Sequence, residues 1–313
     1  MKHWATGMRD SFFGSLFKVA KADPDVILMT SDIGAVCHDK FKKVLPSQYV
    51  NAGVAEQNMV GLAAGLALSG KRVFLYTIIP FLTMRCYEQI RLDLCCMNLP
   101  VTLVGIGAGL DYSTLGPTHH AVSDIALMRS LPHMAIYSPS DNLMAQKIAE
   151  VTCENRGPQY IRLDRVGAPL IYKTSKDIDL AKGLSVIKEG RDLYIISTGR
   201  MVHRALDVAA KLSGRSIDAG VIDLFRLDKI GEGLAKIVGS LDAVVTLEEH
   251  SEVGGIGEAV AGFLAQRSHR PRLIRIALKN DFCRDYGSRE YVLKANGLDV
   301  DSIVKRIKRS LRN

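Results

Sequence analysis

The sequence lacks most features that mark membrane-bound, secreted or metal-binding proteins. No apolar run approaches the roughly 18–20 residues that a membrane helix needs. Residues 1–6 lack the apolar core of a secretory signal, so we expect a cytoplasmic protein without a membrane partner. None of the six cysteines forms a Cys-x-x-Cys pair or a metal-ligand spacing, which indicates reduced structural thiols and no metal site in this chain.

Nucleic acid is also a poor match as a partner, although the net charge is +8. Basic residues gather in the run Lys-Arg-Ile-Lys-Arg at 305–309, directly after the apolar pair Ile303 and Val304. The run has no interleaved aromatic residues, so we interpret it as the solvated face of a helix. A basic enzyme is compatible with anionic sugar phosphates as substrates.

Short β-branched runs alternate with longer amphipathic stretches in the first half of the chain. The expected strands are 26–30, 73–78, 101–106, 134–137 and 160–163. The expected helices are 10–21, 58–68, 86–95, 123–130 and 142–155. Such alternation is typical of an α/β domain with a parallel sheet that helices cover on both faces.

A second, smaller α/β pattern follows a polar stretch at 173–184, and no internal repeat or low-complexity tract interrupts it. Its expected strands are 193–197, 219–223, 243–248 and 273–276, and its expected helices are 202–212 and 257–266. We therefore expect two doubly wound α/β domains, residues 1–172 and 185–313, joined by the linker 173–184.

The stretch Asn-Ala-Gly-Val-Ala-Glu-Gln-Asn at 51–58 contains the first candidate for chemistry. It places Glu56 directly before 59–68, an uncharged run of apolar and small residues that indicates a buried, closely packed helix. The helix dipole alone favours a carboxylate in the first turn. In an apolar setting, the same carboxyl group can share a proton with a bound ligand.

Two further stretches follow expected strands. The segment 76–89 includes Phe81, which by itself would be an ordinary core residue. The segment 105–120 is a Gly-rich loop that ends in Gly-Pro-Thr-His-His, at the strand end where open α/β sheets bind ligands. Its adjacent histidines, His119 and His120, are weak evidence for a metal, because neighbouring residues seldom converge on one ion.

These stretches, in this order and spacing, resemble the pyrimidine-binding domain of thiamine-diphosphate enzymes of the transketolase family. The resemblance extends from about residue 9 to about residue 260. It implies that Glu56 hydrogen-bonds the cofactor's aminopyrimidine and tunes its proton relay. It also implies that Phe81 stacks on the pyrimidine, that Ile78 stands where the family often has a second aromatic residue, and that Arg85 belongs to the same cofactor site.

The Gly-Pro-Thr-His run resembles the active-site loop of transketolases. The resemblance implies that His119 faces the substrate carbonyl, and it makes His120 a neighbour that stands where the family commonly has Gln. Arg165 matches a family arginine that grips a substrate phosphate, and Arg9 matches another. Surface positions, or ion pairs with the adjacent aspartates, would explain both arginines equally well.

Two departures from the family concern the substrate. Transketolases usually carry Glu-Asp before Gly-Pro-Thr-His, where this chain has Thr114 and Leu115, and a phosphate-binding His where it has Gly107. An aliphatic side chain cannot accept a sugar hydroxyl's hydrogen bond, and leaving that hydroxyl unpaired costs about 1–3 kcal/mol. We therefore expect a deoxy, branched or nucleotide-linked sugar, or a different acceptor, in place of ordinary pentose phosphates.

The sequence contains no Gly-Asp-Gly motif, which full-length family members carry in a further amino-terminal domain. There it binds magnesium and, through the metal, the diphosphate. The resemblance therefore implies that this chain is the carboxy-terminal subunit of a split transketolase that transfers a two-carbon ketol unit from a ketose to an aldose. It implies an amino-terminal partner subunit that holds Mg²⁺, and a heterotetramer with two chains of each kind.

Three alternatives stay open. A half-enzyme like 1-deoxy-D-xylulose-5-phosphate synthase would release carbon dioxide from pyruvate. The beta chain of a 2-oxoacid dehydrogenase decarboxylase component would pass an acyl group to a lipoyl domain, but the Gly-Pro-Thr-His loop disfavours it. A non-catalytic scaffold would need none of Glu56, Phe81 and His119. In the second domain, Gly-Gly-x-Gly at 254–257 is a weak phosphate-binding signal, and we expect no catalytic residue there.

Overall fold

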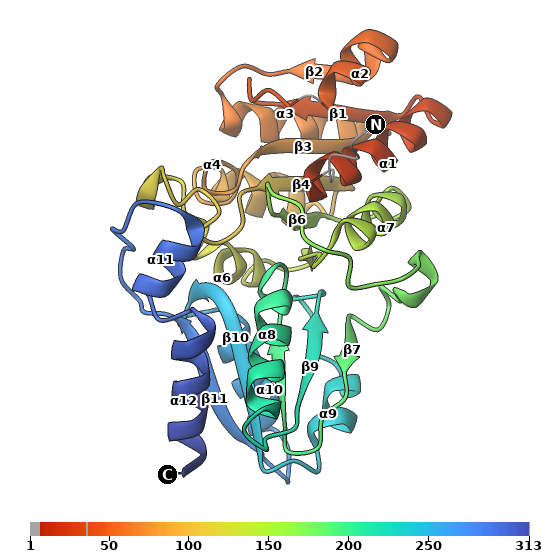
Figure 1. Ribbon diagram of the computed structural model, residues 1–313. Coiled ribbons are helices and arrows are strands. Elements are labelled where there is room, and N and C mark those ends of the chain that lie inside the picture. Colours follow the sequence, from red (N-terminus) through yellow and green to blue (C-terminus); the bar gives the residue numbers. More distant parts are fainter. Residues whose placement is uncertain (1–6, 36, 313) are drawn as a thin grey trace. The chain divides into compact units, whose positions relative to one another are not determined.

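The computed structural model describes residues 7–35 and 37–312, and the chain divides into two compact units, each built around its own sheet (Figure 1). The first unit contains the chain up to residue 108 together with residues 127–178. The second contains residues 109–126 and the chain from 179 onward.

The first unit has a six-stranded sheet in the order β2-β1-β3-β4-β6-β5, with every neighbouring pair parallel. Its strands are β1 (Val26–Thr30), β2 (Tyr49–Asn51), β3 (Arg72–Ile78), β4 (Val101–Ile106), β5 (Ala135–Tyr137) and β6 (Gln159–Leu163). β1 and β4 are buried along their whole length, as is typical of strands covered on both faces. The expected parallel sheet is confirmed, and the short β2 is an additional edge strand.

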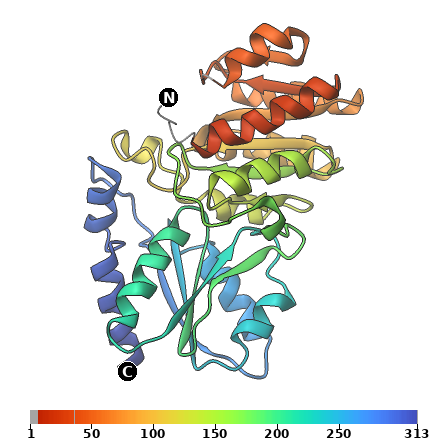
Figure 2. The same ribbon diagram turned by 45° about the vertical axis from the view of Figure 1, so that its right-hand side comes forward.

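Helices cover this sheet. They are α1 (Met8–Ala22), α2 (His38–Val44), α3 (Glu56–Leu68), α4 (Ile79–Thr83), α5 (Tyr87–Gln89), α6 (Asp124–Arg129) and α7 (Asn142–Thr152), with shorter turns η1 (Pro46–Gln48) and η4 (Ser175–Asp177). α1 packs against α7, as Figure 2 shows, and α3 packs against β3. The expected helix at 86–95 is a short α5 followed by a π-helix, η2 (Ile90–Cys96).

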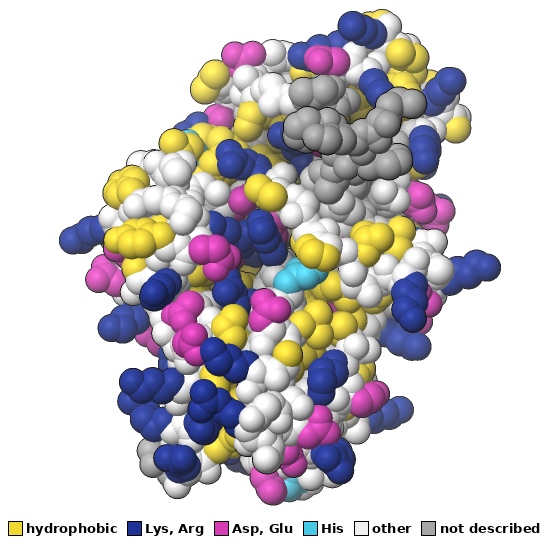
Figure 3. Space-filling model, viewed as in Figure 1, with side chains coloured by type: hydrophobic (Ala, Val, Ile, Leu, Met, Phe, Trp, Pro, Cys, Tyr) yellow, Lys and Arg dark blue, Asp and Glu magenta, His cyan; other side chains and the backbone are white. Residues whose placement is uncertain are grey.

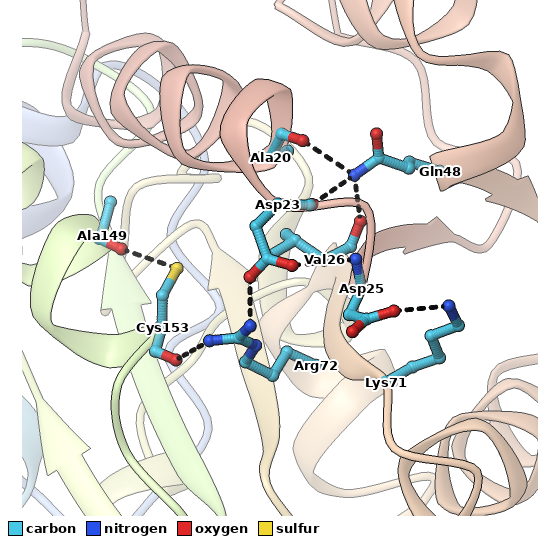
Figure 4. Close-up of polar contacts among 9 residues, drawn as sticks. All are labelled: Ala20, Asp23, Asp25, Val26, Gln48, Lys71, Arg72, Ala149 and Cys153. Atoms are coloured by element: carbon cyan, nitrogen blue, oxygen red, sulfur yellow. Dashed lines mark hydrogen bonds and ion pairs between the residues drawn. The ribbon is translucent and has the colours of Figure 1, made fainter.

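A polar network ties together the amino ends of β1 and β3. Figure 4 shows its members: Ala20, Asp23, Asp25, Val26, Gln48, Lys71, Arg72, Ala149 and Cys153. The Gln48 amide donates to three backbone carbonyls at 2.8–2.9 Å. Arg72, at the start of β3, pairs with Asp23 and donates to the Cys153 carbonyl at 3.3 Å. These contacts fix the amino edge of the sheet, whereas ligands of open α/β sheets bind beyond the opposite, carboxyl edge.

The second unit has a five-stranded sheet in the order β11-β10-β8-β9-β7. Its elements are β7 (Leu184–Lys188), β8 (Leu193–Ser197), α8 (Met201–Ser213), β9 (Ala219–Leu224), α9 (Glu232–Val238), β10 (Ala243–Ser251), α10 (Ile256–Ala265), β11 (Arg272–Leu278), α11 (Arg289–Ala295) and α12 (Val300–Arg312). The edge strand β7 is antiparallel to β9, and the other pairs are parallel. α8 packs against β8 and β9, and α12 packs against α8.

The basic run at 305–309 lies on α12. Ile303, Val304 and Ile307 are buried beneath the helix, whereas Lys305 and Arg309 are not. Figure 3 shows Lys and Arg side chains gathered over this helix. The interpretation of the run as the solvated face of an amphipathic helix is therefore confirmed.

All six cysteines are free thiols, as the sequence predicts. Burial raises the pKa of Cys86, Cys95 and Cys153 to about 12, so these thiols are unreactive near neutral pH. Within 7–35 and 37–312, no helix is long and apolar enough to cross a membrane. The same residues contain no cluster of three or more His, Cys, Asp or Glu side chains that could hold a metal ion.

Candidate active site

The turn that leads into α3 is organised by Asn51, at the carboxyl end of β2. Its amide oxygen accepts the N–H groups of Asp32 at 2.9 Å and Gly53 at 3.0 Å, and its amide nitrogen donates to the Asp32 carboxylate at 2.9 Å. Asp32 follows β1 with a φ of 57°, a left-handed conformation that is uncommon for a residue other than glycine. These bonds join the ends of two strands and set where α3 begins.

Glu56 is the first residue of α3 and is only 4% exposed. The helix dipole favours a carboxylate at this position. Its Oε2 atom accepts a hydrogen bond from Arg85 Nη1 at 2.6 Å. The Arg85 side chain is 43% exposed, so the pair joins a buried carboxylate to a guanidinium at the surface of the unit.

Phe81 reaches this carboxylate through the short helix α4. Ile78, half-buried at the end of β3, caps α4, and Pro80 occupies its first turn. Gly105 in β4 lets α4 approach closely, because a Cβ there would lie 2.6 Å from Ile79 Cγ1. The Arg85 guanidinium carbon lies 4.4 Å from the centre of the Phe81 ring. The structure thus brings Glu56, Phe81 and Arg85 into one cluster.

The two arginines matched to phosphate-binding positions lie on neighbouring segments of the first unit. Arg9, near the start of α1, bonds to Asp10 through Nε at 2.9 Å. Arg165 is exposed and follows the carboxyl end of β6. A Cβ on Gly7 would lie 2.6 Å from the Arg165 carbonyl oxygen. The start of α1 therefore lies directly against the Arg165 segment.

The loop 109–126 belongs to the second unit, where buried charge supports it. Gly109 has a φ of +59°, and a Cβ there would lie 2.6 Å from Cδ of Glu249 in β10. Glu249 is 4% exposed and accepts the Leu110 N–H at 2.9 Å. It also pairs with Arg289, whose Nε lies 3.1 Å from Glu249 Oε1. Gly116 has a φ of +73°, and a Cβ there would overlap the ring of Tyr286.

His119 ends the 3₁₀ turn η3 (Gly116–Thr118) in this loop. Its Nδ1 lies 2.9 Å from Thr118 Oγ1, and its ring centre lies 5.7 Å from that of Tyr112. Burial lowers the pKa of His119, so the imidazole is neutral at neutral pH and has one N–H to donate. Leu115, earlier in the loop, is 46% exposed.

His120 is 3% exposed, and neither of its ring nitrogens has a hydrogen-bond partner within the part of the chain that the structure describes. Burial lowers the pKa of His120 as well, although the nearby Glu249 carboxylate opposes the shift. A buried, neutral imidazole beside His119 is consistent with a packing role and not with a metal ligand.

The weak phosphate signal at 254–257 has an internal explanation. Glu248 Oε2 accepts the Ile256 N–H, and Glu248 Oε1 accepts the Gly257 N–H, each at 2.8 Å. The carboxylate therefore occupies the amino terminus of α10, where an anion would otherwise bind. A Cβ on Gly255 would overlap this carboxylate, which explains the glycine.

The Glu56 cluster has the chemistry that an aminopyrimidine requires. A flat cation already stacks on Phe81 while it hydrogen-bonds a buried carboxylate, and a pyrimidine ring needs this same pair of contacts. The chain therefore suits the pyrimidine half of thiamine diphosphate. No described cluster suits a metal ion, so the residues present do not suit the diphosphate half.

A parallel α/β domain with a buried carboxylate at the start of a helix, followed by a smaller mixed α/β domain, defines the class of two-domain cofactor-dependent transferases. The chain belongs to the transketolase family: residues 6–169 match the pyrimidine-binding domain of transketolase, and residues 183–303 match its C-terminal domain. It is thus a transketolase-type transferase subunit.

Several relatives match over nearly their whole length. One of the two kinds of subunit of the apulose-4-phosphate transketolase of Phocaeicola vulgatus is 33% identical over 300 residues, which cover 95% of each chain. The 6-deoxy-6-sulfo-D-fructose transketolase subunit SqwH of Clostridium sp. is 32% identical, with 97% of this chain and 93% of the relative covered. A solved structure described as a split gene transketolase, inactive beta4 tetramer, has a TM-score of 0.85 and 31% identity, and the match covers 98% of this chain and 99% of that chain.

The chain is also similar to full-length enzymes of a related activity. The 1-deoxy-D-xylulose-5-phosphate synthase of Gloeobacter violaceus is 33% identical over 306 residues, which cover 96% of this chain but 47% of the synthase. The correspondence at both ends is therefore with the subunits of split transketolases.

Proposed function

We propose that this chain is the pyrimidine-binding subunit of a split, thiamine-diphosphate-dependent transketolase that acts on a non-standard sugar. The observation that carries this proposal is the cluster of Glu56, Phe81 and Arg85, in which a buried carboxylate and an aromatic ring share one flat ligand. In this proposal, residues 1–172 form the pyrimidine-binding domain, 173–184 the linker and 185–313 the second domain.

Each proposed residue has a distinct task. Glu56 holds a proton at the ring nitrogen of the aminopyrimidine, and Phe81 and Ile78 pack against the ring. Thiamine diphosphate, when bound, supplies the nucleophilic carbon that makes and breaks the bond to the sugar. The neutral ring of His119 donates a hydrogen bond to the substrate oxygen on which charge develops.

Arg9 and Arg165 are the proposed phosphate contacts. A guanidinium presents paired donors that match the oxygens of a phosphate group, and the two segments lie against one another at Gly7. Arg165 is exposed, so its donors can reach a ligand. The ion pair with Asp10 orients Arg9.

Leu115 supports the choice of a non-standard sugar. It is 46% exposed and presents an aliphatic side chain where a hydroxyl-binding carboxylate is usual in the family. The names of two relatives specify apulose 4-phosphate and 6-deoxy-6-sulfo-D-fructose. We propose a donor of this kind, a branched or deoxygenated ketose with an anionic group.

A partner subunit would supply the magnesium ion and the diphosphate contacts, in a heterotetramer with two chains of each kind. The outer face of α3 supports a docking role. A Cβ on Gly61 or Gly65 would meet no atom within 4 Å, and Leu62 is 46% exposed. The similar solved chain forms a tetramer described as inactive, which supports a requirement for a second kind of subunit. The reduced cysteines fit a cytoplasmic location.

Calorimetry with thiamine diphosphate and Mg²⁺ tests the proposal, first on this chain alone and then on its mixture with the candidate amino-terminal subunit. Binding is expected only in the mixture. Glu56→Gln is expected to abolish turnover in the mixture, whereas Glu88→Gln, the same change at a more accessible position, is expected to leave it unchanged. Tight binding by this chain alone would refute the split site.

One alternative has support from a relative, the half-enzyme of the synthase type. It predicts that the mixture releases carbon dioxide from pyruvate when it joins the remaining two carbons to an aldehyde. Ketol transfer releases no carbon dioxide, so a carbon dioxide assay with pyruvate and a ketose, each offered with the same aldose, separates the two activities.

A further inference from the structure

Arg85 makes, from one side chain, both contacts that the proposed pyrimidine site offers. Its Nη1 donates to Glu56 Oε2 at 2.6 Å, and its guanidinium carbon lies 4.4 Å from the centre of the Phe81 ring. A guanidinium is planar and delocalised, so it stacks on an aromatic face in the way that a small heteroaromatic ring does.

We propose that Arg85 is a placeholder: it fills the pyrimidine site of the unloaded chain and must leave before the cofactor's ring can enter. This inference rests on the proposed function. A ring that stacks on Phe81 and hydrogen-bonds Glu56 must lie on the face of Phe81 that is within reach of Glu56. Arg85 covers that face, so the guanidinium and the pyrimidine exclude one another.

The contacts around Arg85 allow this exchange without movement of the backbone. The Arg85 carbonyl accepts a hydrogen bond from Gln57 Nε2 at 3.1 Å, and the Arg85 N–H donates to the Pro80 carbonyl at 3.3 Å. Its side chain is 43% exposed, so rotation about the side-chain bonds carries the guanidinium into solvent, where water replaces its bonds.

Departure of Arg85 changes the charge balance at Glu56. An isolated ionised carboxylate is costly in a site that is only 4% exposed. Glu56 therefore takes one proton from solvent as Arg85 leaves, and the new O–H group donates to the ring nitrogen of the pyrimidine. Loading is thus coupled to the uptake of one proton, and Glu56 reaches the protonation state that its proposed role requires.

The decisive variant is Arg85→Met, which keeps a long side chain and removes the charge and the donors. Arg91→Met, at an exposed position in η2, is the matched control. In the complex with the diphosphate-binding subunit, calorimetry with thiamine diphosphate and Mg²⁺ should show about tenfold tighter binding for Arg85→Met, the factor expected when one competing charge-assisted hydrogen bond is removed. Arg91→Met should bind like the wild type.

Two measurements do not depend on affinity. Titrations of the wild-type complex in buffers of different ionisation enthalpy should reveal uptake of about one proton, as the buried, uncompensated carboxylate requires. In the free chain, denaturant unfolding of Glu56→Gln, Arg85→Met and the double variant should be non-additive, because the two residues form one pair.

Weaker or equal binding by Arg85→Met, with a wild-type complex that binds, would overturn the placeholder and make Arg85 a direct cofactor contact or a bystander. Absence of proton uptake in the wild type would overturn it as well. If neither the wild type nor the variants bind thiamine diphosphate in the mixture, the proposed function fails together with this inference.

Discussion

Gly109→Ala is expected to unfasten the loop that carries His119. Gly109 has a φ of +59°, and an added Cβ would lie 2.6 Å from both Cγ and Cδ of Glu249 and 2.9 Å from its carbonyl oxygen. Because that oxygen belongs to the backbone of β10, the clash cannot be relieved by a side-chain rotation alone.

The size of the effect follows from two separate penalties. A residue with a Cβ pays about 1–2 kcal/mol for the left-handed conformation. Displacement of Glu249 disturbs a buried carboxylate that holds the Leu110 N–H and Arg289, and leaving a buried polar group unsatisfied costs about 1–3 kcal/mol. We therefore expect the free energy of unfolding of the second unit to fall by about 2–5 kcal/mol.

Urea unfolding measures this loss, and amide hydrogen exchange across 109–126 locates it. The matched control is Gly262→Ala in α10, where a Cβ would meet no atom within 4 Å and where alanine should stabilise the helix by about 0.5–1 kcal/mol. A Gly109→Ala protein within about 0.5 kcal/mol of the wild type, with unchanged exchange at Leu110, would refute the reasoning.

Three other substitutions test single side chains. His119→Asn should lower kcat by about 10²–10³-fold, as loss of an oxyanion donor does, while calorimetric binding of thiamine diphosphate in the complex stays unchanged. Leu115→Asp should raise kcat/KM for an ordinary ketose phosphate about tenfold by restoring a hydroxyl acceptor, and no gain in a donor screen would contradict the assignment. Burial lowers the pKa of His38 from 6.5 to about 4, so the unfolded chain binds the proton first as the pH falls. Stability should therefore be lost between these two values, by up to about 3 kcal/mol. His38→Phe, which keeps a ring against Phe13 and Tyr76, should show a smaller loss between pH 7 and pH 4.5 in thermal melts.

The sequence predicts the strands of both sheets where apolar runs are long enough to carry a signal. β1, β4 and β8 are uninterrupted buried runs, and their bounds agree with the prediction. β2 has three residues, too few for a periodic pattern, and sequence analysis does not detect it. The antiparallel direction of β7 depends on pairing with β9, a contact between distant residues that local periodicity does not encode.

The candidate site shows the same division. Glu56 and Phe81 stand in motifs that the sequence alone can single out, and the structure places them in one cluster. The bond between Glu56 and Arg85 joins residues separated by 29 positions, and no spacing rule links them. The π-helix that follows Arg85 needs a wider turn than the 3.6-residue period used to predict helices, which is why the segment 86–95 resembles an ordinary helix in sequence.

The role of the second domain shows what chain order conceals. The loop 109–126 lies between β4 and β5 of the first sheet in sequence, yet its contacts place it in the second unit. Glu249 holds the Leu110 N–H, Arg289 holds Glu249, and Tyr286 fills the space beside Gly116. If His119 performs the proposed task, these residues of the second domain position it, although none of them touches the substrate in the proposal. The expectation that the second domain contributes no catalytic residue then holds in the strict sense, while the precision of the catalytic loop depends on that domain.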